Sequence, residues 1–176
     1  MNRIEKDSLG EVSIEKNVLY GIHTKRALDN FQVGSATVSA HLIKAFIQVK
    51  KAAAMAHKMI KSYDVLKADY IIAACDDLID NYDSKHYPIK AIQGGAGTST
   101  NMNVNEVIAN RANQLAGKMP GDYDFIDPLI HVNKSQSTND VYPTALRIAT
   151  ILLLRKTSEA FARLQESLQA QEQAYA

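Results

Sequence analysis

The residues that follow Pro143 form an unbroken run without glycine or proline, and this run limits the possible folds more than any other feature. Its apolar side chains recur every three or four positions: Leu146, Ile148, Ala149, Leu152, Leu153, Phe161, Leu164 and Leu168. The pattern predicts a continuous helix of about thirty residues, which is longer than the usual globular helix. Its apolar stripe needs neighbours, so we expect a helical bundle or coiled assembly. The last turns, QAQEQAYA, carry no cap signal, so we expect the helix to continue past Ala176.

Helical periodicity also dominates the rest of the chain. Apolar residues at helical spacing predict three amphipathic helices, over residues 41–61, 66–82 and 101–116. A shorter helical segment is expected at 24–31, and residues 118–130 are expected to form a loop because they contain two proline turn signals. The alternation of residues 11–14 indicates one short strand or hairpin at most. These patterns predict a mainly α fold with a minor β element.

Composition excludes several classes of protein. The 20 basic and 19 acidic residues give a net charge of +1, which argues against a nucleic-acid or membrane-surface partner. Cys75 is the only cysteine, so no internal disulfide can form, and its apolar neighbours indicate a buried inert thiol. The start, MNRIEKDSLG, lacks the apolar segment of a signal peptide, and no apolar stretch approaches the ~20 residues that span a bilayer. We therefore expect a cytoplasmic protein.

The segment from Gln93 to Arg111, QGGAGTSTNMNVNEVIANR, combines a glycine-rich loop with a helix start. Three hydroxyl-bearing residues follow the glycines: Thr98, Ser99 and Thr100. Glycine lets backbone N–H groups approach a ligand, and a helix N-terminus directs unpaired N–H groups and a positive dipole end toward it. Because the loop has no lysine or arginine, its neutral donors suit a small carboxylate better than a nucleoside triphosphate.

A second donor-rich segment, HVNKSQSTNDVYPT, runs from His131 to Thr144. It contains Ser137, Thr138 and Asn139 shortly before Pro143, an arrangement typical of a helix start. If the two starts converge in space, they could hold the two ends of a dicarboxylate. The alternative is that both segments are ordinary capped helices with polar loops.

The same residues carry a family resemblance. GGAGTSTNMNVNEVIANRA and HVNKSQSTNDVYPTA resemble two of the three signature regions of the aspartase/fumarase superfamily, and RIEKDSLGEV…YGIHTKRALDNF resembles its N-terminal segment. YGIHT, GTSTNMN and QSTNDVYPTA are more similar to aspartate ammonia-lyases than to fumarases, which more often show YGAQT, GTQSNMN and QSSND. The resemblance covers almost the whole chain.

This resemblance implies a fold and an assembly. Residues 1–139 would form the helical N-terminal domain, and residues 140–176 would begin the first long helix of a central bundle. Family members are homotetramers whose active sites combine residues of three subunits. The implied reaction is the reversible elimination of ammonia from L-aspartate to give fumarate, without cofactor or metal, and no cluster of cysteine and histidine here has metal-ligand spacing.

The resemblance also implies roles for individual residues. Six residues match family positions that bind the carboxylates and the amino group of the substrate: Thr98, Ser99, Thr100, Ser137, Thr138 and Asn139. The general base of the family is a serine on a GSSxMPxKxNP loop, and no such motif occurs in this sequence. The catalytic residue is therefore unknown, and we expect the 176-residue chain alone to be inactive.

Several alternatives stay open. Glu106 is either a general base or a helix charge that holds a polar network, and His23 is a weaker site candidate. Residues 127–130 read DPLI where many relatives carry HPND, so the second anion site of fumarases is not expected. A fumarase, or a non-catalytic helical binding or assembly module, remains an alternative function. Argininosuccinate and adenylosuccinate lyases fit NMNVNEVIANRA poorly.

Overall fold

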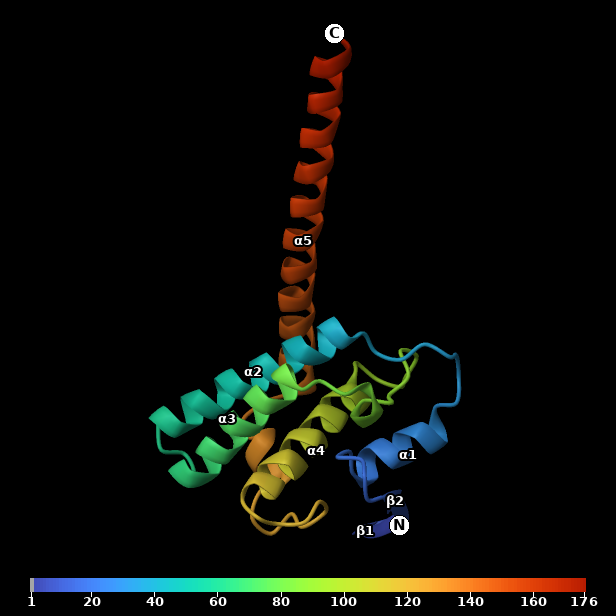
Figure 1. The fold of residues 1–176 in the computed structure, drawn as a ribbon. Helices are drawn as coiled ribbons and strands as arrows, with labels where there is room; N and C mark the ends of the chain where they lie inside the picture. The colour runs from blue at the N-terminus through green and yellow to red at the C-terminus, as the bar shows by residue number, and fades with distance from the viewer. Residues whose placement is uncertain (1) are drawn as a thin grey trace.

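The computed structural model describes residues 2–176, which form a helical body and one long projecting helix (Figure 1). The elements follow one another as β1 Asn2–Asp7, β2 Gly10–Glu15, α1 Ile22–Asn30, α2 Ala40–Met59, α3 Val65–Asp80, η1 Ser84–His86, α4 Thr98–Leu115, η2 Pro128–Val132 and α5 Thr138–Tyr175. The mainly α prediction is confirmed, and the predicted helices at 24–31, 41–61, 66–82 and 101–116 correspond to α1, α2, α3 and α4 within a few residues.

The body is built on a core between α2, α3 and α4, which lie side by side in Figure 1. Each helix buries the apolar stripe that its periodicity indicated, because side chains three and four residues apart share one face. The completely buried core residues include Ile43, Phe46 and Ile47 on α2, Ile71 and Cys75 on α3, and Val104, Val107 and Ile108 on α4. Cys75 is thus a buried free thiol, as expected.

The minor β element is a single hairpin. Strands β1 and β2 pair antiparallel from Asn2↔Glu15 to Asp7↔Gly10. The alternating residues 11–14 lie in β2, and β1 precedes them in the chain. Arg3 fastens the hairpin to the chain that follows, with guanidinium hydrogen bonds to the carbonyl oxygens of Val18 (2.8 Å) and Tyr20 (2.5 Å). The hairpin is thereby held against the start of α1.

Helix α4 begins three residues before its predicted start. Gly97 precedes the helix with a left-handed φ of +88°, and the Gln93 side chain accepts a hydrogen bond from the Thr100 N–H at 3.0 Å. The helix ends just before a glycine: Gly117 has a φ of +75°, and the Lys118 N–H donates to the Asn113 carbonyl oxygen at 2.8 Å.

The predicted loop at 118–130 is partly wrong, because its last residues begin the π-helix η2. Asp127 caps this helix: its Oδ1 accepts the N–H groups of Leu129 and Ile130, each at 2.7 Å. Pro128 occupies the first turn, where its missing N–H costs no hydrogen bond. An aspartate before a proline was therefore a helix start here, although the same pair also marks turns.

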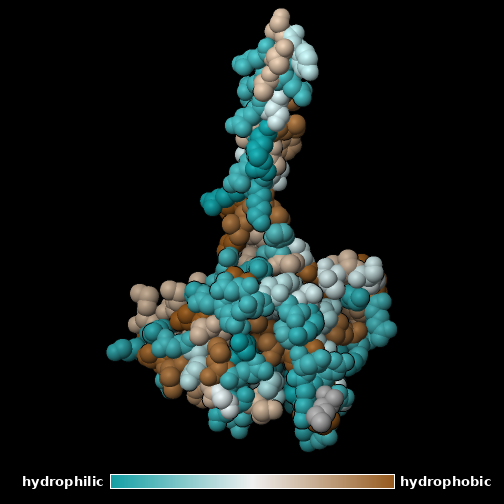
Figure 2. Space-filling model, viewed as in Figure 1, coloured by the Kyte–Doolittle hydropathy of each residue, from teal (hydrophilic) through white to brown (hydrophobic). Residues whose placement is uncertain are grey.

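Helix α5 is 38 residues long and begins five residues before Pro143, earlier than predicted. Ser137 caps it, with Oγ accepting the Asn139 N–H at 3.1 Å. Ala145 and Ala149 pack into the body, and every residue from Thr150 to Ala176 is exposed. Figure 2 shows apolar side chains on the projecting part of this helix, where the exposed ones include Leu154, Phe161, Leu164 and Leu168. Within residues 2–176, no helix combines the length and apolarity required to cross a membrane.

Candidate functional site

The two donor-rich helix starts meet in the structure. The Asn101 side chain in the first turn of α4 donates from Nδ2 to Thr138 Oγ1 in the first turn of α5, at 3.1 Å. Gly97 lies against the ring of Tyr142, and a Cβ at this glycine would approach Tyr142 Cδ2 to 2.1 Å. A glycine is thus required where α4 begins, both by its positive φ and by the proximity of α5.

A cavity of about 450 Å³ opens between these two starts. The glycine-rich loop contributes Gln93, Gly95, Ala96 and Gly97, and α5 contributes Asn139, Tyr142 and Pro143. The cavity therefore lies at two helix N-termini, whose unpaired N–H groups and dipoles favour an anion. Its size suits a small organic molecule.

The six predicted site residues have different environments around this cavity. Asn139 is exposed and lines it, whereas the other five are not part of its lining. Thr98 is exposed and Ser99 half-buried at the start of α4. Thr100 is fully buried, and its hydroxyl is hydrogen-bonded to the Gln93 amide at 2.8 Å.

The remaining two hydroxyls also have partners within the chain. Ser137 caps α5, and Thr138 accepts from Asn101. The structure thus brings both groups of predicted residues into one region, and Thr100, Ser137 and Thr138 use their hydroxyls to build it.

Sequence reasoning missed a buried polar cluster next to the two starts. Its centre is Asn133 Oδ1, which accepts from Lys50 Nζ at 2.9 Å and from the Nδ2 atoms of Asn101 and Asn105, each at 3.1 Å. Burial lowers the pKa of Lys50 from 10.5 to about 7. The available signal was the number of asparagines within the α4 sequence, which include Asn101, Asn103 and Asn105.

Glu106 holds a polar network, which was one of the two interpretations of this residue. The network serves the start of α1 and not the start of α4, the helix that contains Glu106. Its carboxylate accepts the backbone N–H groups of Gly21 (2.9 Å), His23 (2.7 Å) and Thr24 (3.1 Å), together with the Thr24 hydroxyl (2.6 Å). Burial raises the pKa of the Glu106 carboxyl, while these donors act in the opposite direction. Glu106 therefore caps the N-terminus of α1.

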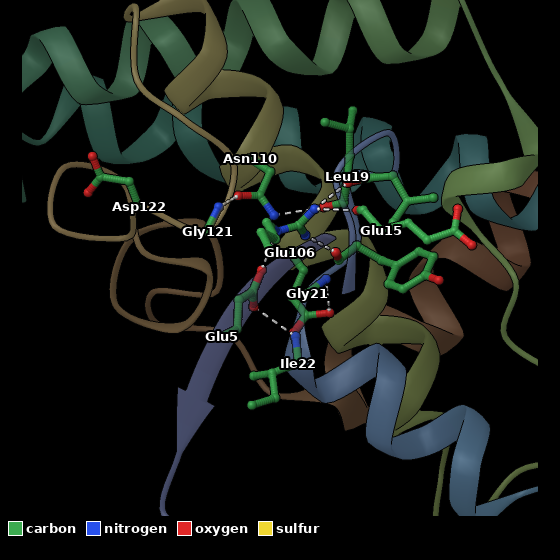
Figure 3. Close-up of polar contacts among 12 residues, drawn as sticks. Glu5, Glu15, Leu19, Gly21, Ile22, Glu106, Asn110, Gly121 and Asp122 are labelled. Carbon is green, nitrogen blue, oxygen red and sulfur yellow. Dashed lines mark hydrogen bonds and ion pairs between the residues drawn. The ribbon is translucent and has the colours of Figure 1, made fainter. Parts of the chain in front are cut away.

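A second carboxylate joins the first at the same place (Figure 3). Glu5 accepts the Ile22 N–H at 2.9 Å, so β1 and α4 each supply a buried acid to the start of α1. A Cβ on Gly21 would lie 2.8 Å from Glu106 Oε1 and 2.9 Å from Glu5 Oε2. His23 is exposed and lines a different cavity of about 360 Å³, so the structure does not bring it to the cavity between α4 and α5.

Comparison with known proteins now decides the family. A family model described as "Lyase" matches residues 10–176. The chain belongs to this lyase family. Fumarate hydratase class II of Wigglesworthia glossinidia brevipalpis is 46% identical to the lyase chain over 156 residues, which is 89% of this chain and 34% of that protein. The aspartate ammonia-lyase of Escherichia coli K12 is 43% identical over 170 residues, which is 95% of this chain and 36% of that protein.

Solved structures agree with this assignment. The fumarate lyase:delta crystallin from Brucella melitensis matches the lyase chain with a TM-score of 0.89 and 46% identity, covering 93% of this chain and 39% of that one. A class II fumarase from Schistosoma mansoni matches with a TM-score of 0.79 and 32% identity, over 85% and 32% of the two chains. The aspartase/fumarase resemblance and its fold are confirmed. The lyase chain spans about a third of the length of the curated relatives above.

Proposed function

We propose that this chain is the N-terminal region of an aspartate ammonia-lyase that reversibly eliminates ammonia from L-aspartate to give fumarate. The convergence of two neutral, donor-rich helix starts on one cavity is the observation that carries this proposal, with the 3.1 Å contact between Asn101 and Thr138 at its centre. Two separate groups of donors suit a substrate with two carboxylates. The residues that resemble ammonia-lyases, YGIHT, GTSTNMN and QSTNDVYPTA, support the amine as the leaving group.

The chemistry explains why neutral donors are useful here. A base removes a proton from the carbon next to the β-carboxylate, and the electron pair moves into that carboxylate to give an aci-carboxylate. The pair then forms the carbon–carbon double bond as the carbon–nitrogen bond breaks and ammonia leaves. The intermediate aci-carboxylate carries a second negative charge, which preoriented donors stabilise in a site that excludes water. We assign six residues to carboxylate and amino-group binding: Thr98, Ser99, Thr100, Ser137, Thr138 and Asn139.

We further propose that residues 1–139 form the N-terminal domain and that residues 140–176 begin a central bundle. The exposed apolar stripe of α5 supports self-association, because Phe161, Leu164 and Leu168 lie in solvent in the chain as described. The family assembly would be a homotetramer. Since the sequence contains no GSSxMPxKxNP loop, we expect residues 1–176 by themselves to show no turnover above background.

Fumarase activity, the elimination of water from L-malate, is the second candidate. The fumarate hydratase of Wigglesworthia glossinidia brevipalpis is as similar to this chain as the ammonia-lyase of a Bacillus species, each at 46% identity. The choice between amine and hydroxyl therefore depends on a few residues in the matched motifs.

The deciding experiment follows the absorbance of fumarate formed by the product of the complete gene, from L-aspartate and separately from L-malate. Formation from aspartate alone supports the ammonia-lyase. Formation of fumarate from malate alone replaces the ammonia-lyase with fumarase, and formation from neither substrate contradicts both.

If the protein forms fumarate, Thr138→Val should lower kcat/KM by about a hundredfold because it removes a preoriented donor. Thr150→Val, which alters an exposed hydroxyl on the same helix, is the control.

A further inference from the structure

A buried lysine lies close to the two helix starts without a carboxylate to neutralise it. Lys50 on α2 is 1% exposed, and its ammonium nitrogen donates to Asn133 Oδ1 at 2.9 Å. None of the ion pairs found within residues 2–176 includes this lysine. An unpaired buried cation costs folding free energy, so a fold that retains one is a candidate for a functional use of the charge.

Hydrogen bonds connect this lysine to both helix starts. Asn133 Oδ1 receives donors from Lys50, Asn101 and Asn105, although a carbonyl oxygen offers only two lone pairs. The Asn101 amide also donates to Thr138 Oγ1. A route from α2 through Asn133 and Asn101 therefore reaches the first turn of α5.

The cluster is not saturated within the chain. The Oδ1 atoms of Asn101 and Asn105 are buried and have no hydrogen-bond partner among the described residues. Three donors thus crowd one oxygen beside a buried cation, next to a loop that carries neither lysine nor arginine from Gln93 to Thr100. The buried charge of Lys50 is therefore linked through Asn133 and Asn101 to Thr138, the residue before the cavity-lining Asn139.

Titratable groups around Lys50 leave its charge uncompensated. Cys75 on α3 is a neutral thiol, because burial raises its pKa far above neutrality. Glu106 on α4 is directed at the start of α1, as its hydrogen bonds require. His57, two turns along α2, is hydrogen-bonded to the Lys134 carbonyl oxygen at 3.0 Å. The group that Lys50 contacts in the segment before α5 is the Asn133 amide, whose Oδ1 also accepts from the amides of Asn101 and Asn105 on α4.

We propose that Lys50 supplies the positive charge for the carboxylate-binding cavity, as a positioning residue that acts through Asn133 and gains a proton when a dicarboxylate binds. This inference rests on the proposed function. A protonated Lys50 polarises the Asn133 carbonyl and orders the amide of Asn101, which in turn holds Thr138. Lysine suits this role because its charge responds to its surroundings, whereas arginine stays protonated.

Coulomb's law gives the size of the expected coupling. A carboxylate about 10 Å from Lys50, in an effective dielectric of about 20, would raise the pKa of the Lys50 ammonium by about one unit. With burial holding the pKa of the free lysine at about 7, the bound form would titrate near pH 8. A dicarboxylate should then bind about tenfold more tightly below pH 7 than above pH 8, with proton uptake in between.

The test measures succinate, an unreactive dicarboxylate, binding to the product of the complete gene by calorimetry at pH 7.5. Two buffers of different ionisation enthalpy report the protons taken up. Wild type should take up a fraction of a proton, and Lys50→Met, which keeps the apolar stem, should take up none and bind about fivefold more weakly near pH 7. Lys44→Met is the matched control: it lies on the same helix, donates to the Ile79 carbonyl oxygen at 2.9 Å and should leave the uptake unchanged.

Each result separates the inference from the proposed function. Succinate binding without proton uptake, or with the same uptake in Lys50→Met, overturns the inference and leaves the proposed function standing. A wild type that binds neither succinate nor aspartate overturns both. If Lys50→Met does not fold, the ε-methylene resonances of wild-type Lys50 decide: a free midpoint near pH 7 that rises with succinate is expected, and a midpoint above pH 10 or an unchanged one overturns the inference.

Discussion

Helices α4 and α5 depart in opposite directions from the rule that polar residues face water. Residues 100–110 of α4 are all buried, although they include four asparagines and Glu106, whereas every residue of α5 from Thr150 onward is exposed, including Phe161 and Leu164. A polar group can be buried when its hydrogen bonds are made, and an exposed apolar stripe is a candidate surface for association.

The two helices differ in how far their side chains find packing and hydrogen-bond partners within this chain. The C-terminal asparagines of α4 find partners here: Asn110 donates to the Leu19 carbonyl oxygen at 2.7 Å, and Asn113 to that of Ile126 at 2.9 Å. The Oδ1 atoms of Asn101, Asn103 and Asn105 are the buried exceptions among the described residues. The apolar stripe of α5 finds none along the projecting part of the helix (Figure 1). Helix α4 thus organises the body, and the exposed stripe of α5 is the surface on which the proposed self-association depends.

Removing the central acid of α4 should have the largest effect. Glu106→Ala would leave three buried N–H groups at the start of α1 without an acceptor, so we expect the free energy of unfolding to fall by about 3–5 kcal/mol. Urea unfolding followed by circular dichroism measures this loss. Glu159→Ala, on the exposed part of α5, is the control and should change stability by less than about 0.5 kcal/mol. Equal effects of the two changes would contradict the distinction between α4 and α5.

The contact between the two helices can be tested at Gly97. Gly97→Ala forces a Cβ to within 2.1 Å of Tyr142 at a φ of +88°, so we expect a loss of about 3 kcal/mol. Gly117→Ala is matched in backbone strain, with a φ of +75° and no atom within 4 Å of the added Cβ, and should cost about 1 kcal/mol. The difference between the two variants in thermal or urea unfolding isolates the contact with Tyr142. Equal losses would show that this contact tolerates a methyl group.

The buried charge next to α4 should appear in the pH dependence of stability. Burial lowers the pKa of Lys50 from 10.5 to about 7, so between these values the unfolded chain binds the additional proton. Stability due to this group should therefore rise with pH from about 7 to about 10.5, by at most about 1.4 kcal/mol per pH unit. Lys50→Met should be more stable than wild type at neutral pH and should lack this rise, as measured by urea unfolding across the range. An unchanged slope would place the titration elsewhere.

The smallest effect on folding, and a clear effect on association, is expected on α5. Leu164→Glu introduces a charge into the exposed apolar stripe and should shift the chain toward monomer in sedimentation velocity, with a change in stability within about 0.5 kcal/mol. Ala170→Glu adds the same charge about 120° away on the helix and should leave association unchanged. A wild-type chain that is already monomeric at high concentration would contradict the proposed role of this stripe.

Helix positions could be predicted because their signal is local, whereas the exact first residues of α4 and α5 could not. Apolar spacing of 3.6 residues marks the buried faces of α2, α3 and α4 in the sequence. The start of α4 depends on the Gln93 side chain and on the ring of Tyr142, which comes from a distant part of the chain. The start of α5 was misplaced because Pro143 was taken as its first turn, although Ser137 already caps the helix.

The candidate site divides in the same way. Its donor-rich segments were visible as Thr98–Thr100 and Ser137–Asn139, because glycine, hydroxyl and amide residues before an apolar run have a known local meaning. Lys50 could not be separated from its neighbour Lys51, which pairs with Asp76 on the surface at 2.5 Å. Only the packing of α2 against α4 and Asn133 makes one of these two lysines a buried cation.

The sequence by itself therefore determined the helical class, the family and the two segments that begin with neutral donors, because periodicity, capping chemistry and motifs are encoded in neighbouring residues. Tertiary structure decided that these segments meet between Asn101 and Thr138 and that Glu106 serves α1. It also decided that Lys50 is buried and bonded to Asn133, within the cluster that reaches Thr138 through Asn101. These outcomes depend on contacts between residues far apart in the chain. Burial then changes the free energy of each charged or polar group and shifts its pKa.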